Sequence, residues 1–178
     1  MKALLLNGSP RQGNTYTALE ALKKGFANIE GLEVGEIEAT NVDVSPCVAC
    51  DTCGETGNCV FDDDTNEVIA AVLEADVVVF ATPVYWWGIT AQLKLIIDKM
   101  YSRGAALQAA KKKVGIIAIG EADQEDVQYE LIAKQFEAIC GYLGWEIAFC
   151  NTYTAGAVGD LAADEKAIAE IEGLWKTI

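Results

Sequence analysis

The stretch from Asn7 to Thr15 is the feature that most constrains how this chain can fold. It follows an apolar run, residues 1–6, that predicts a buried strand. It precedes apolar residues at helical spacing over residues 19–29. A loop that joins a strand to a helix N-terminus is where doubly wound α/β proteins bind phosphate. We therefore expect an α/β fold organised around a phosphate-binding loop.

The composition of this loop favours an anion site. Gly8 and Gly13 permit tight turns and a close approach of the backbone to a ligand. The candidate phosphate donors are Ser9, Arg11, Asn14 and Thr15. A simple helix N-cap at Asn14 or Thr15 is the alternative, but capping alone requires fewer special residues. The loop lacks both the Gly-x-Gly-x-x-Gly and the Gly-x4-Gly-Lys-Ser/Thr patterns, which disfavours a dinucleotide fingerprint and a P-loop ATPase.

Five apolar segments alternate with helical patterns along the chain. Strands are expected at residues 1–6, 32–37, 76–81, 114–119 and 145–150. This alternation predicts the α/β class, with a doubly wound, five-stranded parallel sheet of order 2-1-3-4-5 in three α/β/α layers. We expect residues 1–178 to form a single domain, in which the cysteine-rich segment 41–64 is an elaborated loop.

The composition disfavours several classes of function. The net charge is −14, which argues against nucleic acid and against anionic membrane surfaces as partners. The chain has no histidine, so Ser-His-Asp, Cys-His and histidine–metal mechanisms are excluded. Redox or group-transfer chemistry would therefore depend on a cofactor. The sequence shows neither a signal peptide nor an apolar stretch of membrane-spanning length, and we expect a cytoplasmic protein.

Three consecutive aromatic residues, Tyr85, Trp86 and Trp87, follow the third predicted strand. In a doubly wound sheet this loop lies beside the phosphate-binding loop, at the carboxyl ends of the strands. A flat tricyclic ligand would account for the run, because aromatic faces stack on one another. We expect one of the two tryptophans to pack in the core or at a subunit contact instead.

These loops resemble those of the flavodoxin-like NAD(P)H-dependent FMN reductases. The resemblance rests on Gly-Ser-Pro-Arg followed by Gly-Asn-Thr, on residues 82–88, and on Lys94 and Asp98 with Lys99 in place of the family's arginine. It implies FMN as cofactor and NAD(P)H as cosubstrate. The residues it implies are Ser9, Arg11, Gly13, Asn14 and Thr15 for the phosphate, Pro83, Val84, Tyr85, Trp86 and Gly88 for the isoalloxazine, and Gly120 in a third loop. No catalytic side chain is expected, because the flavin performs the chemistry. We expect the change to Lys99 to affect an ion pair of its helix rather than the flavin.

Four cysteines form a C-x2-C-x2-C-x5-C pattern at Cys47, Cys50, Cys53 and Cys59. In a cytosolic protein this spacing indicates a metal or redox site more than disulfides. Four thiolates so close in sequence suit a [4Fe-4S] cluster better than a single zinc ion. The pattern resembles that of the iron-sulfur flavoproteins, while zinc, a dithiol pair and a structural loop remain alternatives. Cys140 and Cys150 are expected to be plain buried residues.

Three functions are consistent with these features. The first is an FMN-dependent oxidoreductase that takes hydride from NAD(P)H and reduces a flavin, quinone or similar small-molecule acceptor. The second is an iron-sulfur flavoprotein that exchanges single electrons with a ferredoxin-like partner protein. The third is a non-catalytic FMN-binding module. The aromatic loop and the cysteine loop predict exposed apolar surface, and from it a homodimer or homotetramer.

Overall fold

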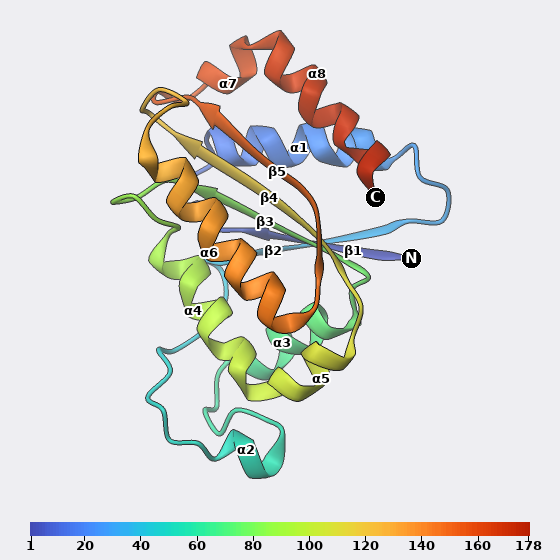
Figure 1. Ribbon diagram of the computed structural model, residues 1–178, viewed down its shortest axis with the longest axis vertical. Coiled ribbons are helices and arrows are strands. Elements are labelled where there is room, and N and C mark those ends of the chain that lie inside the picture. The colour runs from blue at the N-terminus through green and yellow to red at the C-terminus, as the bar shows by residue number, and fades with distance from the viewer.

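The computed structural model describes residues 1–178 and contains one five-stranded parallel sheet (Figure 1). The strands follow the spatial order β2-β1-β3-β4-β5, which confirms the predicted order 2-1-3-4-5. Their bounds are β1 (Lys2–Asn7), β2 (Glu33–Glu38), β3 (Val77–Pro83), β4 (Lys113–Gly120) and β5 (Glu146–Thr154).

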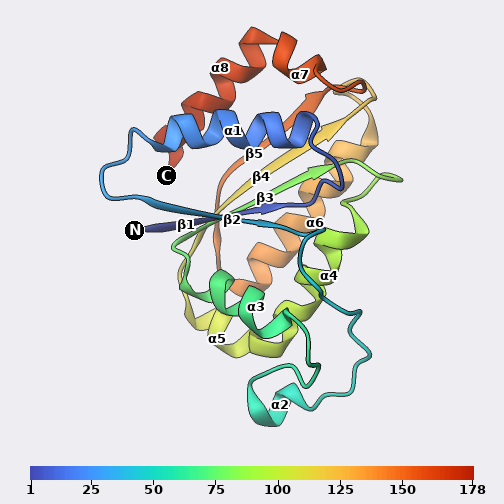
Figure 2. The ribbon, with the colours of Figure 1, turned by 180° about the vertical axis from the view of Figure 1, so that it is seen from behind.

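Helices cover both faces of the sheet, as Figures 1 and 2 show from opposite sides. One face carries α1 (Asn14–Phe26), α7 (Asp160–Ala163), α8 (Glu165–Gly173) and the 3-10 turn η2 (Leu174–Thr177). The other carries α3 (Thr65–Glu74), α4 (Ala91–Lys99), η1 (Met100–Arg103), α5 (Gly104–Ala109) and α6 (Val127–Leu143). The short helix α2 (Cys53–Thr56) lies at the foot of the molecule, beyond α3 and α4.

The sheet separates two hydrophobic clusters. One cluster of 22 buried residues includes Phe80 and Phe136, whose ring centroids are 5.0 Å apart. The other, of 19 buried residues, includes Leu19 and Phe26 of α1. Side chains of β3 enter both clusters, because successive strand residues point to opposite faces. The central strands are therefore buried on both sides, as a continuous apolar run predicts.

The structure departs from the sequence-based expectations in several details. The short helices α2, α5 and α7 were not expected, and β5 continues to Thr154 rather than ending near residue 150. β5 is an edge strand, so its polar second half pairs with β4 through the backbone without an apolar signal in the sequence. No helix in the structure has the length and apolar character that crossing a bilayer requires.

The two cysteines outside the loop differ from one another. Cys140 is buried as expected, and burial raises the pKa of its thiol to about 11, with Cys150 a smaller contribution. The expectation that Cys150 is buried was wrong, because it lies on the edge strand β5 with its side chain exposed.

Candidate functional site

The predicted phosphate-binding loop is fastened to the start of α4. The Gly8 amide donates to the Ala81 carbonyl at 2.8 Å, and the Thr90 hydroxyl donates to the Gly8 carbonyl at 2.8 Å. A Cβ on Gly8 would lie 2.9 Å from Thr90 Oγ1 and 3.0 Å from Leu93 Cβ, so only glycine fits there. The loops that follow β1 and β3 are thereby held side by side at the carboxyl edge of the sheet.

The N-terminus of α1 is open at this edge. Gly13 occupies the N-cap position, and no side chain caps the helix, so the alternative of a cap at Asn14 or Thr15 was wrong. The backbone amides of Asn14, Thr15 and Tyr16 form no hydrogen bond within the protein. The Thr15 hydroxyl forms none either, although the residue is only 2% exposed. Free amides at a positive helix terminus suit a phosphate group.

The Asn14 side chain has a structural role that the sequence did not reveal. Its Nδ2 donates to the carbonyls of Ala155 (3.2 Å) and Ala157 (2.9 Å). Its Oδ1 accepts from the amides of Gly159 (3.2 Å) and Leu161 (3.3 Å). The side chain thus fastens the loop after β5 to α1 and has no donor left for a phosphate, so only the Asn14 amide is available to the ligand.

Ser9 also shapes the loop from within. Its hydroxyl donates to the Arg11 carbonyl at 2.7 Å and accepts from the Arg11 amide at 3.3 Å. The Arg11 side chain is exposed, and its one contact is a 3.5 Å hydrogen bond to the Gly156 carbonyl. The Arg11 guanidinium is therefore free to turn toward an anion, whereas the Ser9 hydroxyl is already engaged.

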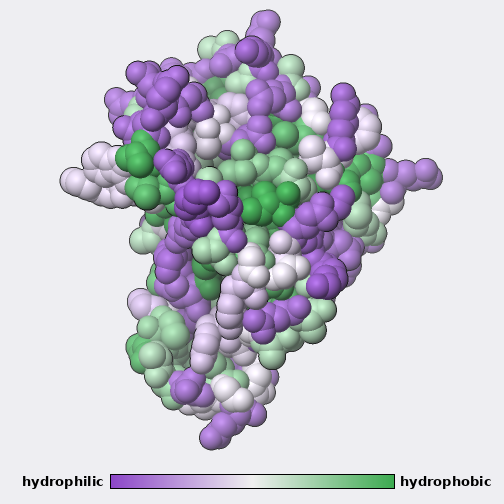
Figure 3. Space-filling view, viewed as in Figure 1, coloured by the Kyte–Doolittle hydropathy of each residue, from purple (hydrophilic) through white to green (hydrophobic).

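The aromatic loop forms a tight turn that projects from the surface. Tyr85 and Gly88 exchange backbone hydrogen bonds of 2.9 and 3.1 Å, and both central residues have positive φ, 47° for Trp86 and 60° for Trp87. This matches a type I′ turn, in which asparagine and glycine are the usual central residues. Trp86 is 92% exposed and Trp87 50%, so neither packs in the core of the chain, and a subunit contact for one of them stays a prediction. Figure 3 shows the projection at the edge where the loop between β3 and α4 lies in Figure 1.

The turn leaves two backbone donors free. The Val84 amide donates to the Ile119 carbonyl at 2.8 Å, and the amides of Tyr85 and Gly88 bond to one another's carbonyls. The amides of Trp86 and Trp87 form no hydrogen bond within the protein. Pro83, at the end of β3, has no N–H to offer. Recognition of a ring edge would therefore fall to the amides of the two tryptophans.

Gly120 ends β4 beside this loop and has no room for a side chain. A Cβ there would lie 2.8 Å from Gln128 Nε2, 2.9 Å from the Tyr129 hydroxyl and 3.2 Å from Val84 Cγ2. Gln128 Nε2 is buried and has no hydrogen-bond partner. The structure thus brings the predicted residues of three loops to one edge, and the unpartnered donors there fit a phosphate-bearing flavin.

The cysteine-bearing segment is a loop closed at its base. The Asp64 amide donates to the Asp43 carbonyl at 2.8 Å, and the Asp43 amide donates to the Asp64 carboxylate at 2.7 Å. Next to this pair, the Asp63 carboxylate accepts from the amides of Ser45 and Thr65, each at 3.0 Å. Burial by itself would raise the pKa of Asp63, but hydrogen bonding to Thr65 and Ser45 outweighs it and lowers the pKa below its ordinary value, with the positive charge of Lys99 a smaller contribution. The loop is therefore anchored at its ends.

All four predicted metal ligands line one small cavity of about 30 Å³ inside this loop, namely Cys47, Cys50, Cys53 and Cys59. No three Cys, Asp, Glu or His side chains are arranged to hold a single metal ion. A polynuclear cluster requires a different arrangement, because each thiolate binds its own iron. Four cysteine thiols are the donor type that such a cluster takes. The cavity itself has room for roughly two waters, at about 10–15 Å³ each, so the loop would have to widen.

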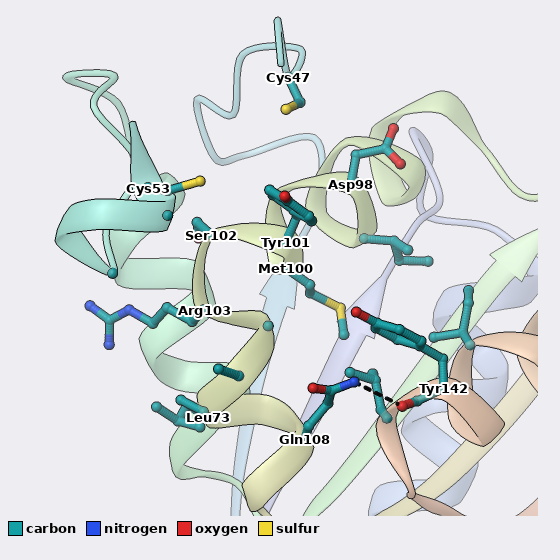
Figure 4. A pocket seen from close by; sticks show the side chains of 18 of the residues that line it. Cys47, Cys53, Leu73, Asp98, Met100, Tyr101, Ser102, Arg103, Gln108 and Tyr142 are labelled. Atoms are coloured by element: carbon teal, nitrogen blue, oxygen red, sulfur yellow. Dashed lines mark hydrogen bonds between the residues drawn. The ribbon is translucent and has the colours of Figure 1, made fainter. Parts of the chain in front are cut away.

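A second, larger cavity of about 1460 Å³ is lined by residues of the cysteine loop, η1, α5 and α6. Figure 4 shows Cys47 and Cys53 on its upper side and Gln108 and Tyr142 on the opposite, lower side, with Tyr101 between them. None of the predicted flavin-binding residues lines it. Helix α4 separates the two regions, because Thr90 at its N-cap contacts the phosphate loop and Lys99 at its end contacts the cysteine loop. Its nine residues span about 14 Å.

Lys99 lies against the cysteines and not in an ion pair of its helix. Its side chain is buried in a residue 2% exposed, with Nζ 3.3 Å from Cys59 Sγ and 4.1 Å from the centroid of the Phe61 ring. The ion pair of α4 is formed by Lys94 and Asp98 at 2.5 Å. The expectation for Lys99 was therefore wrong, because the cysteine loop folds back over the end of α4. Nothing in the sequence indicates this long-range contact.

The exposed Cys50 thiol also responds to its surroundings. Hydrogen bonding to Thr52 lowers the pKa of Cys50, and the positive charge of Lys99 is a smaller contribution in the same direction. The backbone around it is strained, with positive φ at Ala49 (53°) and Asp51 (62°). Ala49 lies between Cys47 and Cys50, and Asp51 lies between Cys50 and Cys53. The chain therefore turns sharply between successive cysteines.

Relatives named iron-sulfur flavoproteins match part of the chain. One from Methanocaldococcus jannaschii is 34% identical over 121 residues, which cover 67% of this chain and 62% of that relative. The chain spans 47 to 62% of the length of three such relatives. A putative NAD(P)H-dependent FMN-containing oxidoreductase of Bacillus subtilis, YwqN, is 26% identical over 184 residues, covering 99% of this chain and 97% of that protein.

A solved structure supports the fold. The NAD(P)H:quinone oxidoreductase from Methanothermobacter marburgensis superposes with a TM-score of 0.71 at 14% identity, covering 98% of this chain and 94% of the other. Residues 1–139, which include all three loops at the sheet edge and the four cysteines, match the family described as NADPH-dependent FMN reductase. This chain therefore belongs to the NADPH-dependent FMN reductase family.

Proposed function

We propose that this chain binds FMN at the carboxyl edge of the sheet and acts as an oxidoreductase that takes its electrons from NAD(P)H. The observation that carries the proposal is the open N-terminus of α1, with three free amides and the free Thr15 hydroxyl, beside the exposed aromatic turn. Bound FMN would accept a hydride and would pass the two electrons on either one at a time or as a pair. Family membership and the FMN-containing relative support this choice of cofactor.

The protein's own groups would bind and orient the cofactor. The amides of residues 14–16, the Thr15 hydroxyl and the Arg11 guanidinium would hold the phosphate against the general repulsion of a chain with net charge −14. The amides of Trp86 and Trp87 would meet the ring edge, and their side chains would cover a ring face. Gly120 has no side chain and so lets Gln128, Tyr129 and Val84 pack closely against the end of β4 beside this edge.

The test is the amount and identity of flavin retained on purification. We expect stoichiometric FMN in the wild type, identified by mass spectrometry of the released flavin. Thr15→Val removes the free hydroxyl and should weaken FMN binding about tenfold or more, since a hydrogen bond to a charged group is worth about 1.5–3 kcal/mol. Thr17→Val is the matched control, because the Thr17 hydroxyl donates only to the carbonyl of Gly13, the N-cap residue one turn before it. Released FAD, or equal binding by both variants, would contradict the phosphate assignment.

A second candidate is that the four cysteines hold a [4Fe-4S] cluster and pass single electrons to a ferredoxin-like protein. The convergence of all four on one cavity favours it, and several relatives carry the name iron-sulfur flavoprotein. Anaerobic purification and reconstitution, followed by iron and sulfide analysis, tests this directly. Cys53→Ser should lose iron and keep FMN, while Cys150→Ser, exposed on β5, should keep both. Iron near zero in the wild type would leave the flavin reductase function alone, with a flavin or quinone as acceptor.

We also propose that the chain forms a homodimer or homotetramer. An indole that is 92% exposed on a strained turn leaves apolar surface that a monomer rarely keeps. Sedimentation should give a mass at least twice the 19.1 kDa of one chain at micromolar concentration. A stable species of one-chain mass would refute this.

A further inference from the structure

Lys99 is a buried cation without a carboxylate partner. It ends α4, is 2% exposed, and takes part in none of the salt bridges of the protein. Its one hydrogen-bond acceptor is Cys59 Sγ at 3.3 Å, and the Phe61 ring lies on another side at 4.1 Å. An ammonium removed from water is costly unless an anion compensates it, and a ring face compensates only in part. The Asp63 carboxylate acts on Lys99 only through space, so the atom in contact with the ammonium, Cys59 Sγ, is where further negative charge would be most favourable.

The cavity beside Lys99 is where such a charge would arise. The four cysteines and Lys99 line the same cavity, and Cys59 is the cysteine that touches the lysine. A [4Fe-4S] cluster with four thiolate ligands is net negative when oxidised and gains one more negative charge when reduced. A fixed positive charge at one ligand stabilises both states, and the reduced state more.

Other charged groups near the cavity are placed differently. Asp63 lies on the base of the loop with its carboxylate bonded to two backbone amides, and Asp98 is engaged with Lys94. Asp51 accepts from the Tyr101 hydroxyl at 3.2 Å. Lys99 is the buried cation of this cavity, since Arg103 lines only the larger neighbouring one.

We propose that Lys99 is a positioning residue of the iron-sulfur site, holding the sulfur of Cys59 and raising the reduction potential of the cluster through its buried positive charge. The proposal rests on the second candidate function above. Lys99 itself exchanges neither electron nor proton in this role. One electron reaches the cysteine site from the flavin chemistry supplied by NAD(P)H, and one leaves it to a one-electron acceptor, so the electrons balance without a further reductant.

The experiment compares Lys99→Met, Lys99→Arg and Lys94→Met in the full chain, purified without oxygen and reconstituted with iron and sulfide. Lys94→Met removes the same charge from a half-exposed side chain of the same helix, where Lys94 pairs with Asp98, a residue that also lines the cysteine cavity. Iron and sulfide per chain, bound FMN and the midpoint potential of the cluster, followed by its electron paramagnetic resonance signal, are measured for each. Wild-type iron content decides the underlying function before any variant is considered.

We expect Lys99→Met to favour the oxidised cluster about tenfold, which for a one-electron couple lowers the midpoint potential by about 59 mV. The potential of Lys99→Arg should stay close to that of the wild type, since arginine keeps the charge. The potential of Lys94→Met, which leaves the Asp98 carboxylate at the cavity without its partner, should fall by clearly less than that of Lys99→Met. An unchanged potential in iron-loaded Lys99→Met, or an equal shift in Lys94→Met, would overturn the proposal. If Lys99→Met cannot hold iron, the proposal requires Lys99→Arg to hold it with FMN bound in both. Loss of iron from Lys99→Arg as well would show that side-chain shape, rather than charge, is what matters.

Discussion

The Thr90 hydroxyl donates a 2.8 Å hydrogen bond to the Gly8 carbonyl, across 82 positions of the chain. The same oxygen caps α4 by accepting from the Leu93 amide at 3.4 Å, and Thr90 is fully buried. One side chain therefore joins the loop after β1 to the helix after β3. The two loops proposed to hold opposite ends of FMN are fixed relative to one another before any ligand arrives.

Thr90→Ala should lower the free energy of unfolding by about 1–2 kcal/mol, because it removes both a helix cap and a buried hydrogen bond. Thr90→Ser keeps the hydroxyl, so it should lower the free energy of unfolding by less than half as much as Thr90→Ala. Urea unfolding of the flavin-free proteins measures this. If alanine and serine destabilise equally, the lost methyl group and not the hydrogen bond would be responsible.

Asn14 and Thr15 are adjacent in sequence, but the structure gives their side chains different tasks. Asn14→Leu removes four hydrogen bonds to the loop after β5 and should cost roughly 1–3 kcal/mol of stability or more. Asn14→Asp keeps the acceptor for the Gly159 and Leu161 amides, so its stability should lie between that of Asn14→Leu and that of the wild type. Thr15→Val should leave the thermal midpoint of the flavin-free protein nearly unchanged. A stable Asn14→Leu that merely binds FMN less well would contradict this division.

The strained turn at Trp86 and Trp87 should lower the stability of the protein while its two rings favour FMN binding. Replacing the pair by Asn and Gly, which suit a type I′ turn, should raise the free energy of unfolding by at least about 1 kcal/mol. The same change should weaken FMN retention, because it removes both rings. Replacing both tryptophans by phenylalanine is the control, since it keeps the strain and the aromatic faces. Chemical denaturation and flavin titration separate the two effects.

Asp63 should make stability depend on pH in the acid range. Its folded pKa lies below the ordinary value of 3.8, so the folded state prefers the ionised carboxylate. The resulting stabilisation is fully present above about pH 4 and is lost as the pH falls through the folded pKa. Asp63→Asn should therefore be less stable than wild type at pH 6, with the difference shrinking below pH 4. Asp62→Asn, at the exposed neighbouring position, should show no such convergence.

The sequence predicted the sheet because its signals are local. Continuous apolar runs such as residues 76–81 and helical spacing such as that of Leu19, Leu22 and Phe26 report burial directly, and alternation of the two fixes the topology. The second half of β5 and the short helices could not be predicted in this way, since backbone pairing at an edge and single turns of helix leave little apolar pattern.

The site was predictable only as a set of loops. Glycines and small polar residues between Asn7 and Thr15 marked the phosphate loop, but which donors stay free depends on contacts with distant residues. Asn14 is taken up by residues some 145 positions away, and Lys99 meets a cysteine 40 positions before it. No local pattern specifies such pairs.

The reciprocal bonds between Asp43 and Asp64 close the cysteine loop at its base, and its further contacts reach the end of α4 and η1. Because the two ends are already joined, ordering or melting the segment between them changes the entropy of that segment and not that of the sheet. On the same ground, a shorter or longer chain between Asp43 and Asp64 would change the entropy of closing this loop only slightly, so its length can vary without rebuilding the sheet.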